Sequence, residues 1–474
     1  MSQPTVASSI TDLLSAIAAS VRIVDGHLVI ADEAQLRGEG IRALVWTATF
    51  TEDEATREAA RWIVAEAASQ LGCSSASIHE LYMARGRGEI GGFTVPALNL
   101  RTQVFDMAAA AFRAATARDV GTVILELARS EQEYTYQRPG EYLTSVLAGA
   151  VAAGWSAPVF VQGDHYQFNA KKYAADPEAV AEGVRNLARE AVAVGYGNID
   201  IDSSTLVDLN ETTVDDQQRV NYTRAAEVAE LIRSVEPADM TVSIGGEIGE
   251  VGKENSTEDE LRAYLDGFRG ELDRMLGTDT IGLSKVSVQT GTSHGGVPLP
   301  GGGVAEVKLD FGTLERLSVV AREYGLAGAV QHGASTLPDE LFHRFPAVET
   351  AEIHLATGFQ NALYSHPAFP ADLQTEIEAW CSANCAAERK PDETETQFIY
   401  KTRKKALGPY KRTLWELPTK DEIIAAQEAK IGYLMEQLAV QGTTEHVARY
   451  VRVPRRVRRM PEALASTTVG SAPA

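Results

Sequence analysis

The sequence predicts an α/β protein built around a (β/α)8 barrel, the TIM-barrel fold. Between about residues 78 and 365, short β-rich segments alternate with helical segments rich in Ala, Leu and Glu. Eight strand segments occur in this region, and eight parallel strands separated by helices close into a barrel. The alternative is an open doubly wound sheet, but no G-x-G-x-x-G follows an early strand.

The predicted strands and helices alternate along this region. The strands are Phe93–Leu98, Thr122–Leu127, Val159–Gln162, Asn198–Ile201, Thr241–Ile244, Lys285–Gln289, Ala329–Gln331 and Ala351–Leu355. Helical periodicity marks the segments between most of them. The clearest helices are Val104–Ala117, Pro177–Val194, Arg224–Val235, Glu258–Leu276 and Thr313–Tyr324.

An extension precedes the barrel and another follows it. Residues 1–77 form a small α/β unit, with strand-like Leu28–Ile30 and Ala43–Trp46 and a helix at Glu54–Leu71. Residues 366–474 are helical, with helices at Ala371–Ala387 and Lys420–Leu438, and end in STTVGSAPA, which we expect to be a disordered tail.

Two basic stretches stand out in this C-terminal extension, at Lys401–Lys411 and Arg449–Arg459. Such stretches usually form a solvated face or a subunit contact. The alternative is a phosphate contact that reaches over a neighbouring barrel mouth.

The charge balance narrows the classes of partner. Asp and Glu number 65 against 44 Lys and Arg, a net charge of −21, which disfavours nucleic-acid binding. A small phosphorylated substrate is still compatible with local basic groups or backbone N–H groups. The 3 cysteines offer no disulfide framework, and no signal peptide or membrane-spanning run is apparent. We therefore expect a cytoplasmic protein that binds no membrane.

Histidines follow three of the predicted strands. His165 comes after Val159–Gln162, His332 after Ala329–Gln331, and His294 in the loop after Lys285–Gln289. The carboxyl ends of barrel strands form the active-site face, so these imidazoles should meet at one mouth. Three imidazoles around one divalent ion, with an open position, form a typical catalytic zinc site. The sequence therefore predicts a metal centre.

Several motifs resemble those of the class II (zinc-dependent) fructose- and tagatose-bisphosphate aldolases. The similar segments are FTVPALNL, PVFVQGDH, GYGNIDIDSS, IGGEIGEVGKEN, GTSHGG and QHGAST, between residues 78 and 365. The resemblance implies a zinc lyase that cleaves or forms a C–C bond in a ketose (bis)phosphate similar to fructose 1,6-bisphosphate. Dihydroxyacetone phosphate would be the donor product, and zinc would stabilise the enediolate charge as a Lewis acid.

The resemblance also implies roles for residues. Zinc would be held by His165, His294 and His332. Glu247 would take the metal at an alternative, buried position, and Asp202 would lie in the polar surroundings of the metal. A monovalent cation often assists phosphate binding in this family, whose members are usually homodimers or higher homo-oligomers.

Asp164 would be the acid/base for the substrate hydroxyl. Glu254 is a second candidate acid, next to the position where Asn255 replaces a family acid. Substrate would be bound by Asn99, Gly295, Gly333, Ser335, Thr357 and His354.

The chain departs from the family pattern at other points. Gly245 stands where the Glu-rich signature has its first acid, and His354 and Ala356 replace an Asn and an Asp of the last strand. Two alternatives therefore stay open: a non-catalytic barrel subunit of a tagatose-bisphosphate aldolase complex, and a metal-dependent sugar-phosphate isomerase or epimerase.

Overall fold

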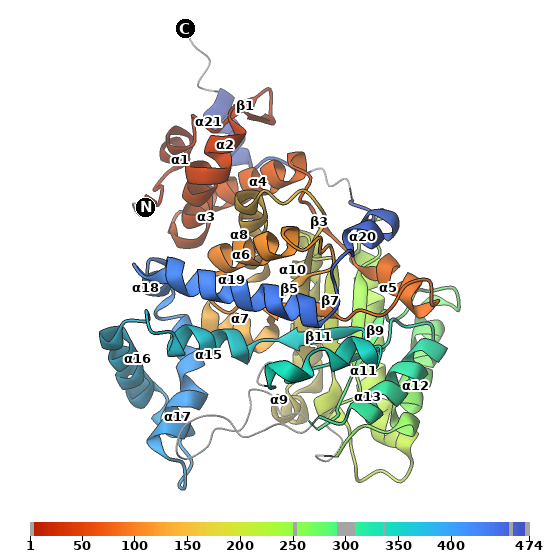
Figure 1. Cartoon of the computed structure of the whole chain (residues 1–474). Coiled ribbons are helices and arrows are strands. Elements are labelled where there is room, and N and C mark those ends of the chain that lie inside the picture. Colours follow the sequence, from red (N-terminus) through yellow and green to blue (C-terminus); the bar gives the residue numbers. More distant parts are fainter. Residues whose placement is uncertain (1–3, 250–253, 292–308, 335–336, 455–457, 470–474) are drawn as a thin grey trace.

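Eight parallel strands form a closed barrel in the computed structural model (Figure 1), which describes residues 4–249, 254–291, 309–334, 337–454 and 458–469. Each strand pairs with the next, and the last pairs with the first. The strands are β4 (Val95–Asn99), β5 (Ile124–Ala128), β6 (Val159–Gln167), β7 (Asn198–Asp202), β8 (Ser243–Glu247), β9 (Lys285–Val288), β10 (Ala329–Gln331) and β11 (Glu352–Leu355). The predicted (β/α)8 barrel is confirmed, with strand ends shifted by a few residues.

Helices connect the strands and cover the barrel. The main ones are α6 (Val104–Thr116), α8 (Pro139–Ala153), α10 (Pro177–Val194), α11 (Val214–Val235), α12 (Glu258–Leu276), α13 (Phe311–Glu323) and α15 (Thr357–Ser365). Local signals set their ends: α10 begins with Pro177 after the Asp176 cap, and α12 begins with a Thr257–Glu260 capping box. The two helices have the predicted bounds because these caps are visible in the sequence.

The N-terminal extension pairs a short hairpin with helices. Strands β1 (Val21–Val24) and β2 (His27–Ile30) form the hairpin, beside α1 (Ile10–Ala16), α3 (Ile41–Phe50) and α4 (Glu54–Gln70). The predicted strand at Ala43–Trp46 is wrong, because these residues lie within α3. A short apolar run fits a buried helix as well as a strand, and packing against α4 and α8 selects the helix.

The C-terminal extension is helical, and its last helix packs against the N-terminal extension. Its elements are α16 (Ala371–Asn384), α17 (Glu395–Thr402), η6 (Arg403–Leu407), α18 (Lys411–Trp415), α19 (Lys420–Gln437), α20 (Thr444–Tyr450) and α21 (Glu462–Val469). Helix α19 packs on α6, and α21 lies against α1 and α4 (Figure 1). The Trp62 indole donates a hydrogen bond to the Arg458 carbonyl at 3.1 Å.

The predicted disordered tail is wrong for residues 466–469, which belong to α21, and residues 470–474 lie outside the described part of the chain. Among the described helices, none combines the length and apolar character that crossing a bilayer requires.

Candidate functional site

A cavity of about 310 Å³ lies at the carboxyl ends of the barrel strands. Strand ends supply much of its wall, and the C-terminal extension contributes one residue, Lys404. The strand-end residues are Asn99, Glu126, Ala128, Asp164, His165, His332, Gly333, His354, Ala356 and Thr357. This is the face on which barrel enzymes carry their sites.

His165 occupies an irregular position in β6. The pairing of β6 with β7 shifts between Gly163 and Tyr166, and His165 has a φ of 39°, in the left-handed region. Bulges of this kind redirect a side chain, and strained backbone concentrates at functional sites. The His165 Nδ1 atom lies 3.0 Å from both Asp202 Oδ2 and Glu247 Oε2.

The His332 ring lies between two other imidazoles. Its centroid is 4.2 Å from that of His165 and 4.0 Å from that of His354. The His332 Nε2 atom is 2.9 Å from the Ser287 hydroxyl. Asp164, His165 and His332 offer ligand atoms that all lie within 4.8 Å of one another, as do His165, Asp202 and Glu247. We call Asp164, His165, Asp202, Glu247 and His332 the mouth cluster.

The structure thus brings together the predicted ligands His165, His332, Glu247 and Asp202. The predicted third imidazole, His294, lies outside the described residues, as do Gly295 and Ser335.

Charge in the mouth cluster favours a cation. Burial and repulsion from Asp202 raise the pKa of Glu247 to about 7. Burial alone would lower the pKa of His165, but the Asp164 and Glu247 carboxylates raise it well above its usual value. Burial acts to raise the pKa of Asp202, but the hydrogen bond with His165 outweighs burial, and the pKa of Asp202 is lowered. Nitrogen and oxygen donors in one open, electronegative group fit zinc or a similar divalent ion.

A second acidic group lies nearer the amino ends of the strands, and we call it the axial cluster. It consists of Glu126, Asp200, Lys285, Glu352 and His354, all buried. The Lys285 ammonium donates to Asp200 at 2.9 Å and also pairs with Glu352. The His354 Nε2 atom is 2.7 Å from Glu352 Oε1, and its Nδ1 atom is 3.0 Å from Glu126 Oε1.

The axial cluster carries its own cation. Burial disfavours charge on Glu352, but the Lys285 ammonium keeps the pKa of Glu352 well below its usual range. Burial raises the pKa of Asp200 to about 6, and burial with the Asp164 charge raises that of Glu126 to about 7. Although Glu126, Glu352 and His354 have the spacing of a metal group, Lys285 already provides a positive charge there. The mouth cluster contains no lysine, and its members Asp164, His165 and His332 line the cavity, so it is the better candidate metal centre.

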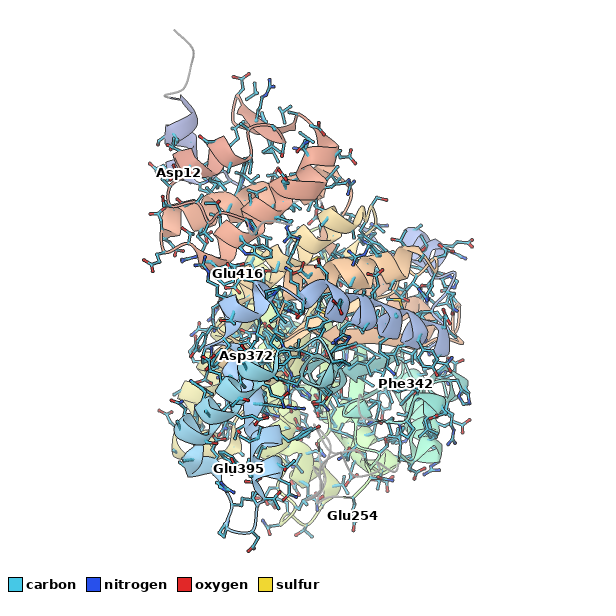
Figure 2. The ribbon with its side chains drawn as sticks, turned by 60° about the vertical axis from the view of Figure 1, so that its left-hand side comes forward. Asp12, Glu254, Phe342, Asp372, Glu395 and Glu416 are labelled. Atoms are coloured by element: carbon cyan, nitrogen blue, oxygen red, sulfur yellow. The ribbon has the colours of Figure 1, made fainter. Side chains whose placement is uncertain are left out.

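The remaining predicted residues divide into two groups. Asn99, Gly333 and Thr357 line the cavity, and the Asn99 amide donates to Glu131 at 2.6 Å and to Asp164 at 3.5 Å. Glu254 is exposed at the edge of the molecule (Figure 2) and does not line the cavity.

Sequence reasoning missed two sets of residues. The axial acids and Lys285 were visible only as charged residues inside otherwise apolar strands, which is itself unusual for buried positions. Arg101, Glu131 and Tyr134 of the cavity wall carried no local signal of their shared location. Lys404 belongs to the basic stretch Lys401–Lys411, but the structure places it in the cavity of its own chain.

Comparison with known proteins agrees with this geometry. The family described as class-II fructose-bisphosphate aldolase matches residues 87–405. No curated protein sequence matches the chain.

Among solved structures, the chain is similar to a fructuronate-tagaturonate epimerase from Cohnella laeviribosi. The sequence identity is 10%, the TM-score is 0.55, and the match covers 89% of this chain and 90% of that chain. A probable tagatose 6 phosphate kinase from Sinorhizobium meliloti has 16% identity, coverage of 80% and 97%, and a TM-score of 0.51. A fructose-bisphosphate aldolase from Campylobacter jejuni has 15% identity, coverage of 76% and 93%, and a TM-score of 0.44.

At these identities the first two of these structures support the fold alone. The family match is the stronger finding, because it spans more than half of the chain and contains the mouth cluster. The family is generally metal dependent, which agrees with the donor set described above. This chain belongs to the class II fructose-bisphosphate aldolase family and is an aldolase-like enzyme.

Proposed function

We propose that the protein is a zinc-dependent aldolase that cleaves or forms a C–C bond in a ketose phosphate. The substrate would resemble fructose 1,6-bisphosphate, with dihydroxyacetone phosphate as the donor product. The observation that carries the proposal is the meeting of His165 and His332 with three carboxylates at an open barrel mouth. Family membership supplies independent support.

His165 and His332 would hold the metal, together with His294 and with Glu247 as a carboxylate ligand at an alternative position. Asp202 contacts His165 Nδ1 and would fix the orientation of that ring. When bound, the zinc supplies Lewis-acid stabilisation of the negative charge that develops on the substrate.

The protein's own groups would handle the proton and the position of the substrate. Asp164 is buried, faces the cavity and would take or return the hydroxyl proton at a carboxylate oxygen. Asn99 contacts Asp164 and Glu131, so it would hold these carboxylates apart and in place. Gly333, with a φ of 70°, lets the backbone approach the phosphate closely, alongside Gly295 and Ser335.

The test combines metal analysis with a cleavage assay. We expect the purified protein to contain zinc and to release dihydroxyacetone phosphate from fructose 1,6-bisphosphate or a related ketose phosphate. The variant His165→Ala should lose zinc and activity, because it removes a shared ligand. His27→Ala is the matched control, since His27 is exposed in the N-terminal hairpin. A zinc-free, inactive wild-type protein, or an H165A variant with unchanged zinc content, would refute the proposal.

A metal-dependent epimerase is the second candidate, favoured by His354. Its ring packs on His332, and its Nδ1 atom lies 3.3 Å from Asp164 Oδ1, so a second proton-carrying group faces the same cavity. NMR analysis of products separates the two reactions. An aldolase yields two shorter carbon chains, whereas an epimerase yields an isomer of unchanged length.

A further inference from the structure

The C-terminal extension places one lysine in the wall of the barrel cavity. Lys404, in η6, lines the cavity beside Tyr134 of α7 (Arg129–Thr135), with its ammonium 5.7 Å from the Tyr134 ring centroid. Nearby lysines are neutralised: Lys401 pairs with Glu393 at 2.7 Å and Lys405 with Glu388 at 2.5 Å. Among the described residues, Lys404 has no hydrogen bond or ion pair.

The charge of this cation is only partly compensated. Lys404 is partly buried, and this burial, together with the nearby positive charge of Arg101, lowers its pKa, while the Glu131 and Glu388 carboxylates act in the opposite direction without outweighing it. Burying a charged group is unfavourable unless it is paired, and Lys is rarely buried without a partner. An anion in the cavity would remove this cost.

Arg101 adds a second cation to the same wall. Its guanidinium pairs with Glu131 at 2.7 Å and donates to the side-chain amide oxygen Oε1 of Gln360 at 3.0 Å. The positive charge of Arg101 is therefore paired within the protein, whereas Lys404 has no ion-pair partner among the described residues. The fixed planar guanidinium also has the geometry to donate to an anion beside it.

These cations are separated from the mouth cluster by a chain of contacts. Asp164 contacts Asn99, Asn99 contacts Glu131, and Glu131 contacts Arg101. The cavity thus has an acidic, metal-binding end and a basic end. A substrate held by the metal at one end would bring its opposite end to the cations.

We propose that Lys404, assisted by Arg101, binds an anionic group at the end of the substrate away from the metal, and that each chain supplies this lysine to its own cavity. This inference rests on the proposed function for the orientation of the substrate. Phosphate and carboxylate share the required chemistry, so the ligand is a sugar with an anionic far end. Lys404 is then a specificity-determining residue.

The experiment uses two pairs of sugars, and the members of each pair differ only at the far end. Fructose 1,6-bisphosphate carries a phosphate there and is compared with fructose 1-phosphate, whereas fructuronate carries a carboxylate there and is compared with fructose. Calorimetry measures their binding to zinc-loaded wild-type protein and to the variants Lys404→Met, Lys404→Arg and Lys405→Met. Lys405→Met is the matched control, because Lys405 is adjacent and already paired with Glu388.

We expect K404M to weaken binding of one far-end anion by about tenfold or more, the range for a hydrogen bond to a charged group. K404R and K405M should bind nearly as wild type, and the sugars without the far-end anion should bind all variants alike. Loss with fructose 1,6-bisphosphate would identify a phosphate, and loss with fructuronate a carboxylate. Equal effects on sugars with and without the far-end anion, or no effect, would overturn the proposal.

Turnover gives a second readout where cleavage is observed. K404M should raise KM with little change in kcat, because the contact is made in ground state and transition state alike. Binding by calorimetry needs no turnover, so failure of the aldolase proposal would leave this test intact. Mixing K404M with H165A subunits should leave KM at the raised value of K404M. A return of KM to the wild-type value on mixing would overturn the assignment of Lys404 to its own chain's cavity.

Discussion

The two acidic clusters inside this barrel differ in what balances their negative charge. In the axial cluster, the Lys285 ammonium lies 2.9 Å from Asp200 and pairs with Glu352, with Gln162 as a further partner at 2.8 Å. In the mouth cluster, among the described residues, no lysine or arginine pairs with Asp202 or Glu247, and His165 is their ion-pair partner.

The difference separates a structural role from a binding role. A lysine is a permanent part of the chain, so the axial cluster is balanced whenever the protein is folded. The mouth cluster faces a cavity and has donors suited to a divalent ion, so its balance depends on what it binds. Three measurements test whether the two clusters have these separate roles.

The largest effect should come from removing the axial cation. Lys285→Met keeps the aliphatic stem but leaves Asp200 and Glu352 without their ammonium partner, and breaking a buried pair typically costs about 3–5 kcal/mol. We expect the free energy of unfolding, measured by urea denaturation, to fall by that amount. The control is Lys430→Met, which removes an exposed pair with Asp339 and should cost about 0–1 kcal/mol. A K285M variant as stable as wild type would show that the axial carboxylates need no cation.

A smaller effect should separate the clusters by metal affinity. Asp202→Asn weakens the contact that orients His165, and loss of such outer contacts typically costs about 10–100-fold in metal affinity. Asp200→Asn is the matched control, because it makes the same change on the same strand but in the axial cluster. We expect zinc competition titrations to show weaker binding only for D202N. Equal losses in both variants would mean that the clusters do not act separately.

The smallest effect concerns pH. The raised pKa of Glu247, about 7 against an ordinary 4.5, means that metal-free protein keeps this proton below pH 7. A binding metal must then displace this proton from the Glu247 carboxyl group. The contribution of Glu247 to zinc affinity therefore falls about tenfold per pH unit below about pH 7 and is constant above it. In zinc titrations, Glu247→Gln should reduce the number of protons released by about one below pH 7 and leave it unchanged well above pH 7. An unchanged pH dependence in E247Q would exclude Glu247 from the metal site.

The sequence indicated the barrel well because its signal is local. Each strand shows as a short β-rich run between helical segments, and caps such as Asp176 and Thr257 mark where helices begin. The closed barrel then follows from the number and order of the elements. Where the local signal was ambiguous, as at Ala43–Trp46, the prediction of a strand was wrong, because tertiary packing chose a helix.

The candidate site also contains features that the sequence predicted and features that it did not. The approach of His165 to His332 was predictable, since the carboxyl ends of all the strands of a parallel barrel share one mouth. Local sequence signals were therefore sufficient to predict the fold and the face of the barrel that carries the candidate metal site. Only the tertiary structure placed Lys285 among the axial carboxylates and brought Lys404 to Arg101. Those contacts join residues far apart in the chain, and local periodicity carries no information about which distant charges will meet.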